Sequence, residues 1–183
     1  GGVRPSKAIF VPPPFELVED LMANLEGYIH DEVLRTPTLI KAGIAHAQFE
    51  TIHPFLDGNG RLGRLLIALL LCSETVLAEP VLYLSLYFKT NRDEYYESLQ
   101  RVRTQGDWEV WMEFFLQGVF ETAQQAFTTA QSLLELIDRD QKKIRTIGRS
   151  TGSALQLLQL VQRKIFFNVK DAGDELRLSL PTV

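Results

Sequence analysis

The sequence of 183 residues has very little cysteine, no excess of positive charge and no hydrophobic run long enough to cross a membrane. The single cysteine, Cys72, cannot form an internal disulfide bond and lies in an apolar stretch, where packing is its expected role. A formal net charge of −4 gives no overall basic field that would attract nucleic acid. The main apolar run, residues 65–72, is too short to span a bilayer, and no signal peptide is visible.

What remains is the composition of an ordinary globular protein. Hydrophobic residues make up 45% of the chain and charged residues 23%, proportions that are typical of soluble domains. The length is sufficient for one sizeable core, or for one core with a small appendage. We therefore expect a cytoplasmic protein that does not interact with membranes. Because the chain begins with Gly1 and Gly2 rather than methionine, we also expect a fragment of a longer protein.

Polar residues and glycines cluster in residues 53–64, HPFLDGNGRLGR, directly before the main apolar run. That run is too long for most strands, so it indicates a helix buried on all sides, with the glycine-rich loop at its N-terminus. The first N–H groups of a helix lack intrahelical partners and lie at the positive end of its dipole. Gly58 and Gly60 let the backbone curl closely around a guest, so the loop is expected to form an anion-binding nest.

The charged side chains of this loop suit a polyphosphate accompanied by a divalent cation. Arg61 and Arg64 are three residues apart, so both can project from one side of the first helical turn and bind phosphate oxygens in pairs. Asp57 would repel phosphate unless a cation lay between them, and a Mg²⁺ ion held by this carboxylate and phosphate oxygens resolves the conflict. His53 lies four residues before Asp57 and can be neutral at pH 7, which makes it a candidate general base.

Two other phosphate and metal motifs can be set aside. Residues 58–63 match the dinucleotide pattern G-x-G-x-x-G, but that pattern requires a preceding strand within a βαβ unit. The segment before His53 has helical periodicity instead. An EF-hand loop is excluded because Arg61 stands where a ligand is required and no glutamate closes the loop.

Residues 53–64 fill every fixed position of the pattern His-x-Phe-x-Asp-Gly-Asn-Gly-Arg-x-x-Arg, and the sequence thereby resembles the Fic family. The flanking segments 45–50, AHAQFE, and 91–96, NRDEYY, also resemble Fic cores, so the resemblance covers residues 10–120 well. It implies an all-α fold, a helical bundle around a central buried helix. It also implies that residues 1–147 form a Fic domain, in which residues 1–14 are the end of a flap region or an N-terminal arm.

The resemblance further implies an enzyme, a nucleotidyltransferase that moves AMP from ATP to Ser, Thr or Tyr hydroxyls of target proteins. In this interpretation His53 is the catalytic base, Asp57 holds Mg²⁺, and Asn59 contacts phosphate as well as capping the helix. Self-modification, and removal of AMP by the same site, are further activities that the resemblance allows. The residues expected to bind the nucleotide are Gly58, Asn59, Gly60, Arg61, Arg64, Tyr95 and Tyr96.

Three further side chains carry narrower expectations. Tyr95 and Tyr96 are consecutive, so on a helix they face about 100° apart, and we expect one in the core and the other at a nucleobase pocket. His46 lies two helical turns before His53, and we expect it to be a hydrogen-bonded support of the site.

Apolar periodicity predicts helices over residues 15–30, 37–52, 91–103, 108–144 and 153–166, with a shorter helix or turn over 82–87. Thr36 resembles an N-cap with Pro37 at the first helical position. Pro54 disfavours helical geometry at His53, which should therefore end its helix and face the loop. Residues 8–11 are compatible with an edge strand that the following prolines end.

Residues 148–183 form a predicted appendage, a helical linker followed by a partial winged helix-turn-helix. Residues 169–176, a turn at 177–178 and residues 179–183 resemble the opening of that motif without its recognition helix. We therefore favour a packing or homodimerisation role over a working DNA reader. The alternative for the whole protein is a nucleotide-sensing regulatory or DNA-binding protein built on a Fic core.

Overall fold

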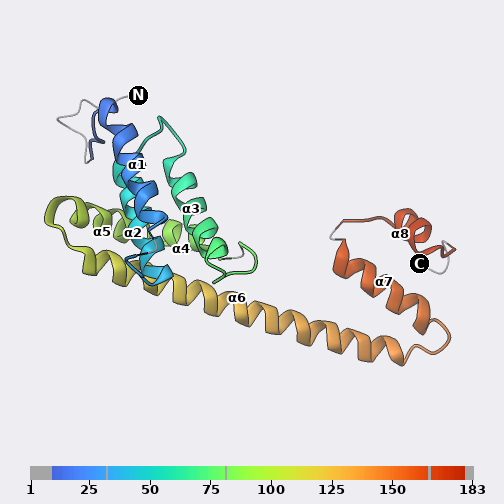
Figure 1. Ribbon diagram of the computed structural model, residues 1–183. Coiled ribbons are helices and arrows are strands. Elements are labelled where there is room, and N and C mark those ends of the chain that lie inside the picture. Colours follow the sequence, from blue (N-terminus) through green and yellow to red (C-terminus); the bar gives the residue numbers. More distant parts are fainter. Residues whose placement is uncertain (1–9, 32, 81, 165, 180–183) are drawn as a thin grey trace. The chain divides into compact units, whose positions relative to one another are not determined.

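The computed structural model describes residues 10–31, 33–80, 82–164 and 166–179, and Figure 1 shows that they are largely helical. No strand occurs within these ranges, which confirms the all-α fold; the edge strand expected at residues 8–11 falls largely outside them. No helix in this described part is long and apolar enough to cross a membrane. The elements are η2 (Phe15–Leu17), α1 (Val18–Ile29), α2 (Thr38–Ile52), α3 (Asn59–Ser73), α4 (Leu84–Thr90), α5 (Arg92–Gln105), α6 (Trp108–Arg145), α7 (Thr151–Arg163) and α8 (Val169–Leu176).

The chain divides into two compact units, residues 1–126 and residues 127–183. The first unit contains η2, α1 to α5 and the first half of α6, and the second contains the remainder of α6 with α7 and α8. The division therefore falls inside the longest helix. The domain boundary that the sequence suggests after residue 147 lies in the turn that follows α6, and it stays a prediction.

The central helix of the first unit is α2, which packs against α1, α3 and α5. A glycine on α2 also allows α6 to approach closely, because a Cβ on Gly43 would lie 3.0 Å from both Met112 and Phe115 of α6. The carbonyl of Gly43 accepts a hydrogen bond of 2.9 Å from the indole N–H of Trp111, a fully buried residue. An apolar core built from α1 to α6 thus surrounds α2 and fixes its C-terminal end, where the glycine-rich loop begins.

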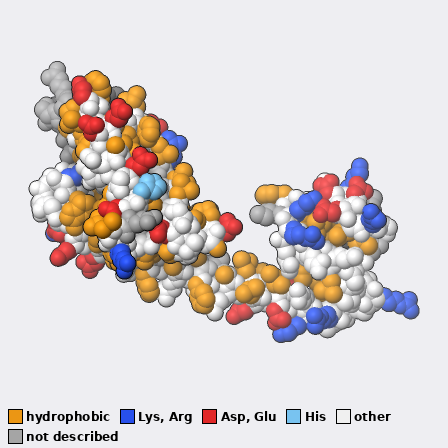
Figure 2. Space-filling model, viewed as in Figure 1, with side chains coloured by type: hydrophobic (Ala, Val, Ile, Leu, Met, Phe, Trp, Pro, Cys, Tyr) orange, Lys and Arg blue, Asp and Glu red, His pale blue; other side chains and the backbone are white. Residues whose placement is uncertain are grey.

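The prediction that residues 65–72 form a helix is confirmed, but the prediction that this helix is buried on all sides is wrong. Ile67 and Leu71 of α3 are buried against the core, whereas Leu65 and Leu69 point outward, with Leu69 56% exposed. The outward leucines line an apolar groove of about 660 Å³ between α3 and α1. Figure 2 shows hydrophobic side chains at the surface over these helices. An unbroken apolar run carries no periodicity, so it could not indicate which face remains open.

Most helix ends agree with the sequence, with one informative correction. Pro37 has an extended ψ of 136° and precedes α2, so Pro37 rather than Thr36 occupies the N-cap position. Its carbonyl accepts the first helical bond, from Lys41 N, at 2.9 Å. The short helix α4 extends further along the chain than the segment expected to contain it. The long helix α6 and the helix over residues 153–166 are confirmed within a few residues.

The second unit, beyond the end of α6, consists of α7 packed on α8. Leu160 and Ala172 are its buried apolar residues, and a capping box between Asn168 and Asp171 begins α8. Arg177 follows α8 in a left-handed conformation with φ of 54°, which confirms the turn predicted at residues 177–178. Residues 180–183 lie outside the described chain, so the winged-helix resemblance stays a prediction.

Candidate active site

The loop between α2 and α3 begins and ends with a residue in the left-handed conformation. His53 caps α2 with φ 51° and ψ 56°, and its N–H still donates to the carbonyl of Phe49 at 2.9 Å. Pro54 makes right-handed helical geometry unfavourable for the residue before it, so α2 cannot continue. Gly58, with φ 87°, then provides the N-cap of α3. His53 therefore stands at the helix end beside the loop, as the sequence predicts.

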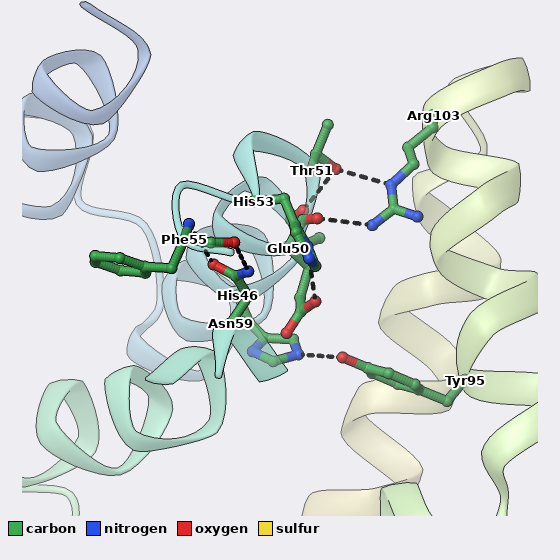
Figure 3. A network of polar contacts seen from close by, with 9 residues as sticks. His46, Glu50, Thr51, His53, Phe55, Asn59, Tyr95 and Arg103 are labelled. Atoms are coloured by element: carbon green, nitrogen blue, oxygen red, sulfur yellow. Dashed lines mark hydrogen bonds and ion pairs between the residues drawn. The ribbon is translucent and has the colours of Figure 1, made fainter. Parts of the chain in front are cut away.

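Asn59 holds the loop closed from within. Its buried side-chain amide donates to the carbonyl of Phe55 at 2.6 Å and accepts from the Phe55 N–H at 2.9 Å (Figure 3). Asn59 is the first residue of α3 rather than its cap, so the expected capping role is wrong. The side-chain oxygen and nitrogen of Asn59 thus both bind the backbone of Phe55, four residues earlier in the loop. The predicted contact with phosphate remains a prediction.

At the N-terminus of α3, backbone N–H groups that precede the intrahelical hydrogen bonds lie beside two arginine side chains. The first helical bond of α3 runs from Leu62 N to the carbonyl of Gly58, so the N–H groups of residues 59–61 precede the helical ladder. Arg61 forms an ion pair with Asp57 at 3.1 Å, and Asp57 is 91% exposed. Arg64 is half-buried and donates from Nε to the hydroxyl of Ser85 on α4 at 3.1 Å. Arg61 thus contacts the loop through Asp57, and Arg64 contacts α4 through Ser85. That both bind phosphate from one side of the first helical turn stays a prediction.

A polar network lies beneath the loop, and Figure 3 shows how its members converge. The fully buried ring of His46 stacks on Trp111, and its Nε2 lies 2.9 Å from the hydroxyl oxygen of Tyr95. Burial lowers the pKa of His46 to about 4 and raises that of Tyr95, so both groups are neutral at pH 7. His46 is therefore a hydrogen-bonded support of the site, as expected, and its partner is a tyrosine from α5.

Two charged residues of this network, Glu50 and Arg103, were not predicted from the sequence to take part in the site. Glu50 is buried on the last turn of α2, and its Oε2 lies 4.0 Å from Nδ1 of His53. Arg103 of α5 donates to the carbonyl of Glu50 at 2.9 Å and to the hydroxyl of Thr51 at 3.2 Å. Burial raises the pKa of Glu50 and lowers that of Arg103. The spacing of three residues between Glu50 and His53 could have revealed the first residue, but no local signal pointed to Arg103.

Two clefts open beside these residues. One, of about 550 Å³, is lined by Phe10, Glu50, His53, Arg92, Tyr96 and Arg103 among others. The second, of about 340 Å³, includes Arg64 and Tyr95 in its lining and shares Arg92 and Tyr96 with the first. Tyr95 is buried and Tyr96 is exposed, in agreement with the offset expected for consecutive helical residues. Together the clefts connect the surroundings of Arg64 with the ring of His53.

The described residues contain no group of three or more His, Cys, Asp or Glu side chains that could enclose a metal ion. Asp57 contributes one exposed carboxylate at the edge of the loop. This suits Mg²⁺, which commonly keeps several waters and binds through one or two carboxylates together with substrate phosphates. The donor set present therefore fits a magnesium ion that arrives with a nucleotide.

Comparison with known proteins relates this helical bundle to one family. Residues 2–71 match the Fic/DOC family. The structure resembles the crystal structure of a Fic family protein from Desulfovibrio desulfuricans G20, with a TM-score of 0.61 and 28% sequence identity. That match covers 93% of this chain and 46% of the other. The match of residues 2–71 and the structural similarity confirm the resemblance to the Fic/DOC family that the loop carries.

Curated relatives match between about a third and a half of the chain. A protein of Aquifex aeolicus named probable protein adenylyltransferase is 37% identical over 94 residues, which is 51% of this chain and 26% of that protein. Protein adenylyltransferase Fic of Culex quinquefasciatus is 37% identical over 99 residues, 53% of this chain and 18% of that protein. A Fido domain-containing protein of Dictyostelium discoideum is 41% identical over 68 residues, 36% of this chain and 46% of that protein. The chain spans less than half the length of each of these relatives.

Proposed function

We propose that this chain is a Fic-type protein adenylyltransferase, which transfers AMP from ATP to a hydroxyl side chain of a protein. The observation that carries the proposal is the placement of His53 at the end of α2, beside free N–H donors flanked by Arg61 and Arg64. Relatives that are named protein adenylyltransferases support it. Asp57, at the edge of the same loop, supplies the carboxylate that a metal-bound triphosphate needs.

The ion pair between Arg61 and Asp57 is suited to opening when a nucleotide binds. Both side chains are exposed, and such surface pairs contribute little free energy, about 0–1 kcal/mol. A magnesium triphosphate offers each of them a stronger partner, phosphate oxygens for Arg61 and the metal for Asp57. When bound, Mg²⁺ would neutralise phosphate charge and favour departure of pyrophosphate. A guanidinium nitrogen of Arg64 lies 3.1 Å from the position that a Cβ on Gly60 would take, so glycine leaves room for it there.

The nucleoside would occupy the clefts that share Arg92 and Tyr96. Tyr96 exposes an aromatic face there, and the guanidinium of Arg92 lies 5.5 Å from the centroid of that ring. An aromatic ring with a neighbouring guanidinium is a suitable surface for a stacked base. From that position the triphosphate can reach the N-terminus of α3, because Arg64 lines the second cleft.

In the proposed reaction the hydroxyl oxygen of the target side chain attacks the α-phosphorus of ATP. A bond forms from this oxygen to the α-phosphorus while the bond to the bridging oxygen breaks, and pyrophosphate leaves. His53 takes the hydroxyl proton as general base, a contribution of roughly 10²–10⁴ to the rate. The donors of residues 59–61 and the two arginines stabilise the charge on the phosphates.

Transfer of label from ATP and Mg²⁺ tests the proposal directly. Cell-lysate proteins and the chain itself serve as acceptors, with α-labelled and γ-labelled ATP in parallel. We expect labelling from the α-position only, lost in His53→Ala and retained in His30→Ala, which changes an exposed histidine at the end of α1. Near-normal labelling by His53→Ala, or labelling from the γ-position alone, would contradict the proposal.

The alternative of a nucleotide-sensing regulatory protein gives a different result in the same preparation. It predicts no label transfer, together with DNA binding that weakens steeply as salt is raised. The net charge of −4 does not favour it. Self-modification would appear as α-label on the chain itself, and removal of AMP as loss of that label after ATP is withdrawn. These activities, like homodimerisation, stay predictions.

A further inference from the structure

The candidate base and a neighbouring glutamate each carry a buried polar atom without a hydrogen-bond partner among the described residues. Among the described residues, neither Nδ1 of His53 nor Oε1 of Glu50 has a hydrogen-bond partner. The His53 side chain is 38% exposed overall, yet its Nδ1 is shielded from solvent, so Nε2 is the nitrogen left to meet a ligand in the cleft. The Glu50 side chain is only 7% exposed, and its second oxygen lies 4.0 Å from that Nδ1.

Glu50 is constrained at its backbone by α5 and at its carboxylate by α3. Arg103 holds the backbone of the last turn of α2 through the carbonyl of Glu50. On the opposite side, a Cβ on Gly63 of α3 would lie 3.0 Å from Oε1 of Glu50, and a Cβ on Gly60 would lie 3.6 Å from it. Glycine at position 63 therefore leaves a slot that this carboxylate occupies. The same segment of α3 forms the phosphate nest on its outer side and the carboxylate slot on its inner side.

We propose that Glu50 is a positioning residue for His53: its carboxylate accepts a hydrogen bond from the Nδ1–H group, directs Nε2 toward the cleft and stabilises the imidazolium that forms during transfer. The inference rests on the proposed function, because it assigns His53 the role of base. A contact of 4.0 Å is longer than a hydrogen bond, and catalytic hydrogen bonds are often long before the substrate binds. A modest rotation of either side chain closes it.

The charged neighbours of Glu50 favour its ionised form at the moment of transfer, although burial opposes it. The titratable and charged groups that face it are His46 and His53 from α2, Arg64 from α3, and Tyr95 and Arg103 from α5. Burial raises the pKa of Glu50, while His53, Arg103 and Arg64 oppose that rise. When His53 takes a proton from the target hydroxyl, the new positive charge lies next to this carboxylate and strengthens the opposing effect.

The experiment replaces Glu50 by Gln in the full chain, which keeps the shape and the acceptor oxygen but removes the charge. We expect kcat/KM for AMP transfer to fall roughly 10- to 100-fold with KM for ATP nearly unchanged, and the acidic limb of the pH–rate profile to move to lower pH. Glu50→Asp should recover part of the rate. Glu97→Gln, an exposed carboxylate on α5, is the matched control and should leave the rate and the profile unchanged.

Two readouts separate positioning from simple loss of structure. Because its pKa is raised, ionised Glu50 lowers the stability of the native state as the pH rises, so Glu50→Gln should unfold at the same temperature as the wild type or higher at pH 7.5. Nitrogen-15 NMR of the His53 ring should show the proton on Nδ1 in the wild-type chain. A wild-type rate and pH profile in Glu50→Gln, or a His53 proton on Nε2, would overturn the inference.

The NMR measurement requires no transferase activity. If the wild-type chain transferred no label, the proposed function would fail, while the position of the His53 proton would still decide whether Glu50 is its partner.

Discussion

At the scale of single residues, the site is built from polar groups that have been taken out of water. His46 is fully buried against Trp111, and Tyr95 provides the polar atom that its Nε2 meets. A buried polar group without a partner would cost about 1–3 kcal/mol of stability. The contact between His46 and Tyr95 avoids that cost for the two atoms that meet. His53 itself adopts a left-handed conformation that costs about 1–2 kcal/mol for a residue other than glycine. The surrounding contacts offset that cost.

The lowered pKa of His46 makes the stability of the native chain depend on pH. Its pKa in the native chain, about 4, lies below its usual value of 6.5, so the native state binds this proton less readily than the unfolded state. His46 should therefore contribute stability that is complete above pH 6.5 and is lost as the pH falls toward 4, in total about 3 kcal/mol. NMR titration of the ring should show it neutral down to about pH 4.

Urea unfolding between pH 7 and pH 4.5 provides the control for that prediction. In His46→Asn the part of the pH dependence that comes from this proton should disappear, whatever the stability of the variant at pH 7. A His46 ring that titrated near pH 6.5 in the folded chain would mean that water reaches it, contrary to its complete burial.

At the scale of helices, the approach of α6 to α4 depends on one glycine. A Cβ on Gly118 would lie 2.5 Å from a ring carbon of Tyr87, closer than two such atoms can stay. The carbonyl of Gly118 also accepts a hydrogen bond of 2.6 Å from the hydroxyl of Thr122. Because α4 carries Ser85, the partner of Arg64, this contact lies two residues from the site.

Gly118→Ala should therefore lower the free energy of unfolding by about 1–3 kcal/mol, since the new methyl group overpacks the contact. Gly27→Ala in α1 is the matched control, because nothing lies within 4 Å of its Cβ position. There the better helix propensity of alanine should raise stability by up to about 1 kcal/mol. Chemical unfolding of the two variants measures the difference. Equal or greater stability of Gly118→Ala would show that α6 and α4 can move apart freely.

At the scale of the whole molecule, the core and the candidate site lie in the same part of the chain. The buried apolar residues of the core, and those packed against it, fall between Val18 and Val119. The site residues fall between His46 and Arg103 together with Phe10. The second unit, residues 127–183, contributes none of these described residues. Its packing of α7 on α8 is a separate, smaller structure.

Residues 1–147 alone should then unfold cooperatively and retain the transfer of α-label that depends on His53. Circular dichroism during heating and the labelling assay measure the two properties on one preparation. A gradual, non-cooperative loss of helix would show that the first unit requires residues 148–183 for folding. Cooperative unfolding without activity would instead assign those residues a part in the reaction.

The features that could be predicted from the amino-acid sequence are those that depend on neighbours within one or two helical turns. Apolar periodicity predicted the helices, and Pro54 placed His53 at a helix end. The glycines and arginines of residues 53–64 indicate a phosphate site, which stays a prediction. Each of these follows from backbone conformation and from side chains a few residues apart, which a linear sequence encodes directly.

Which distant groups meet beneath the loop, and which face of α3 stays open, depends on how the helices pack in three dimensions. Arg103 reaches Glu50 across 53 positions of the chain, and Tyr95 reaches His46 across 49. Leu69 is exposed although its sequence neighbours are equally apolar. Such contacts depend on how α2, α3 and α5 pack against one another, and this packing is a property of complementary surfaces that no single segment contains.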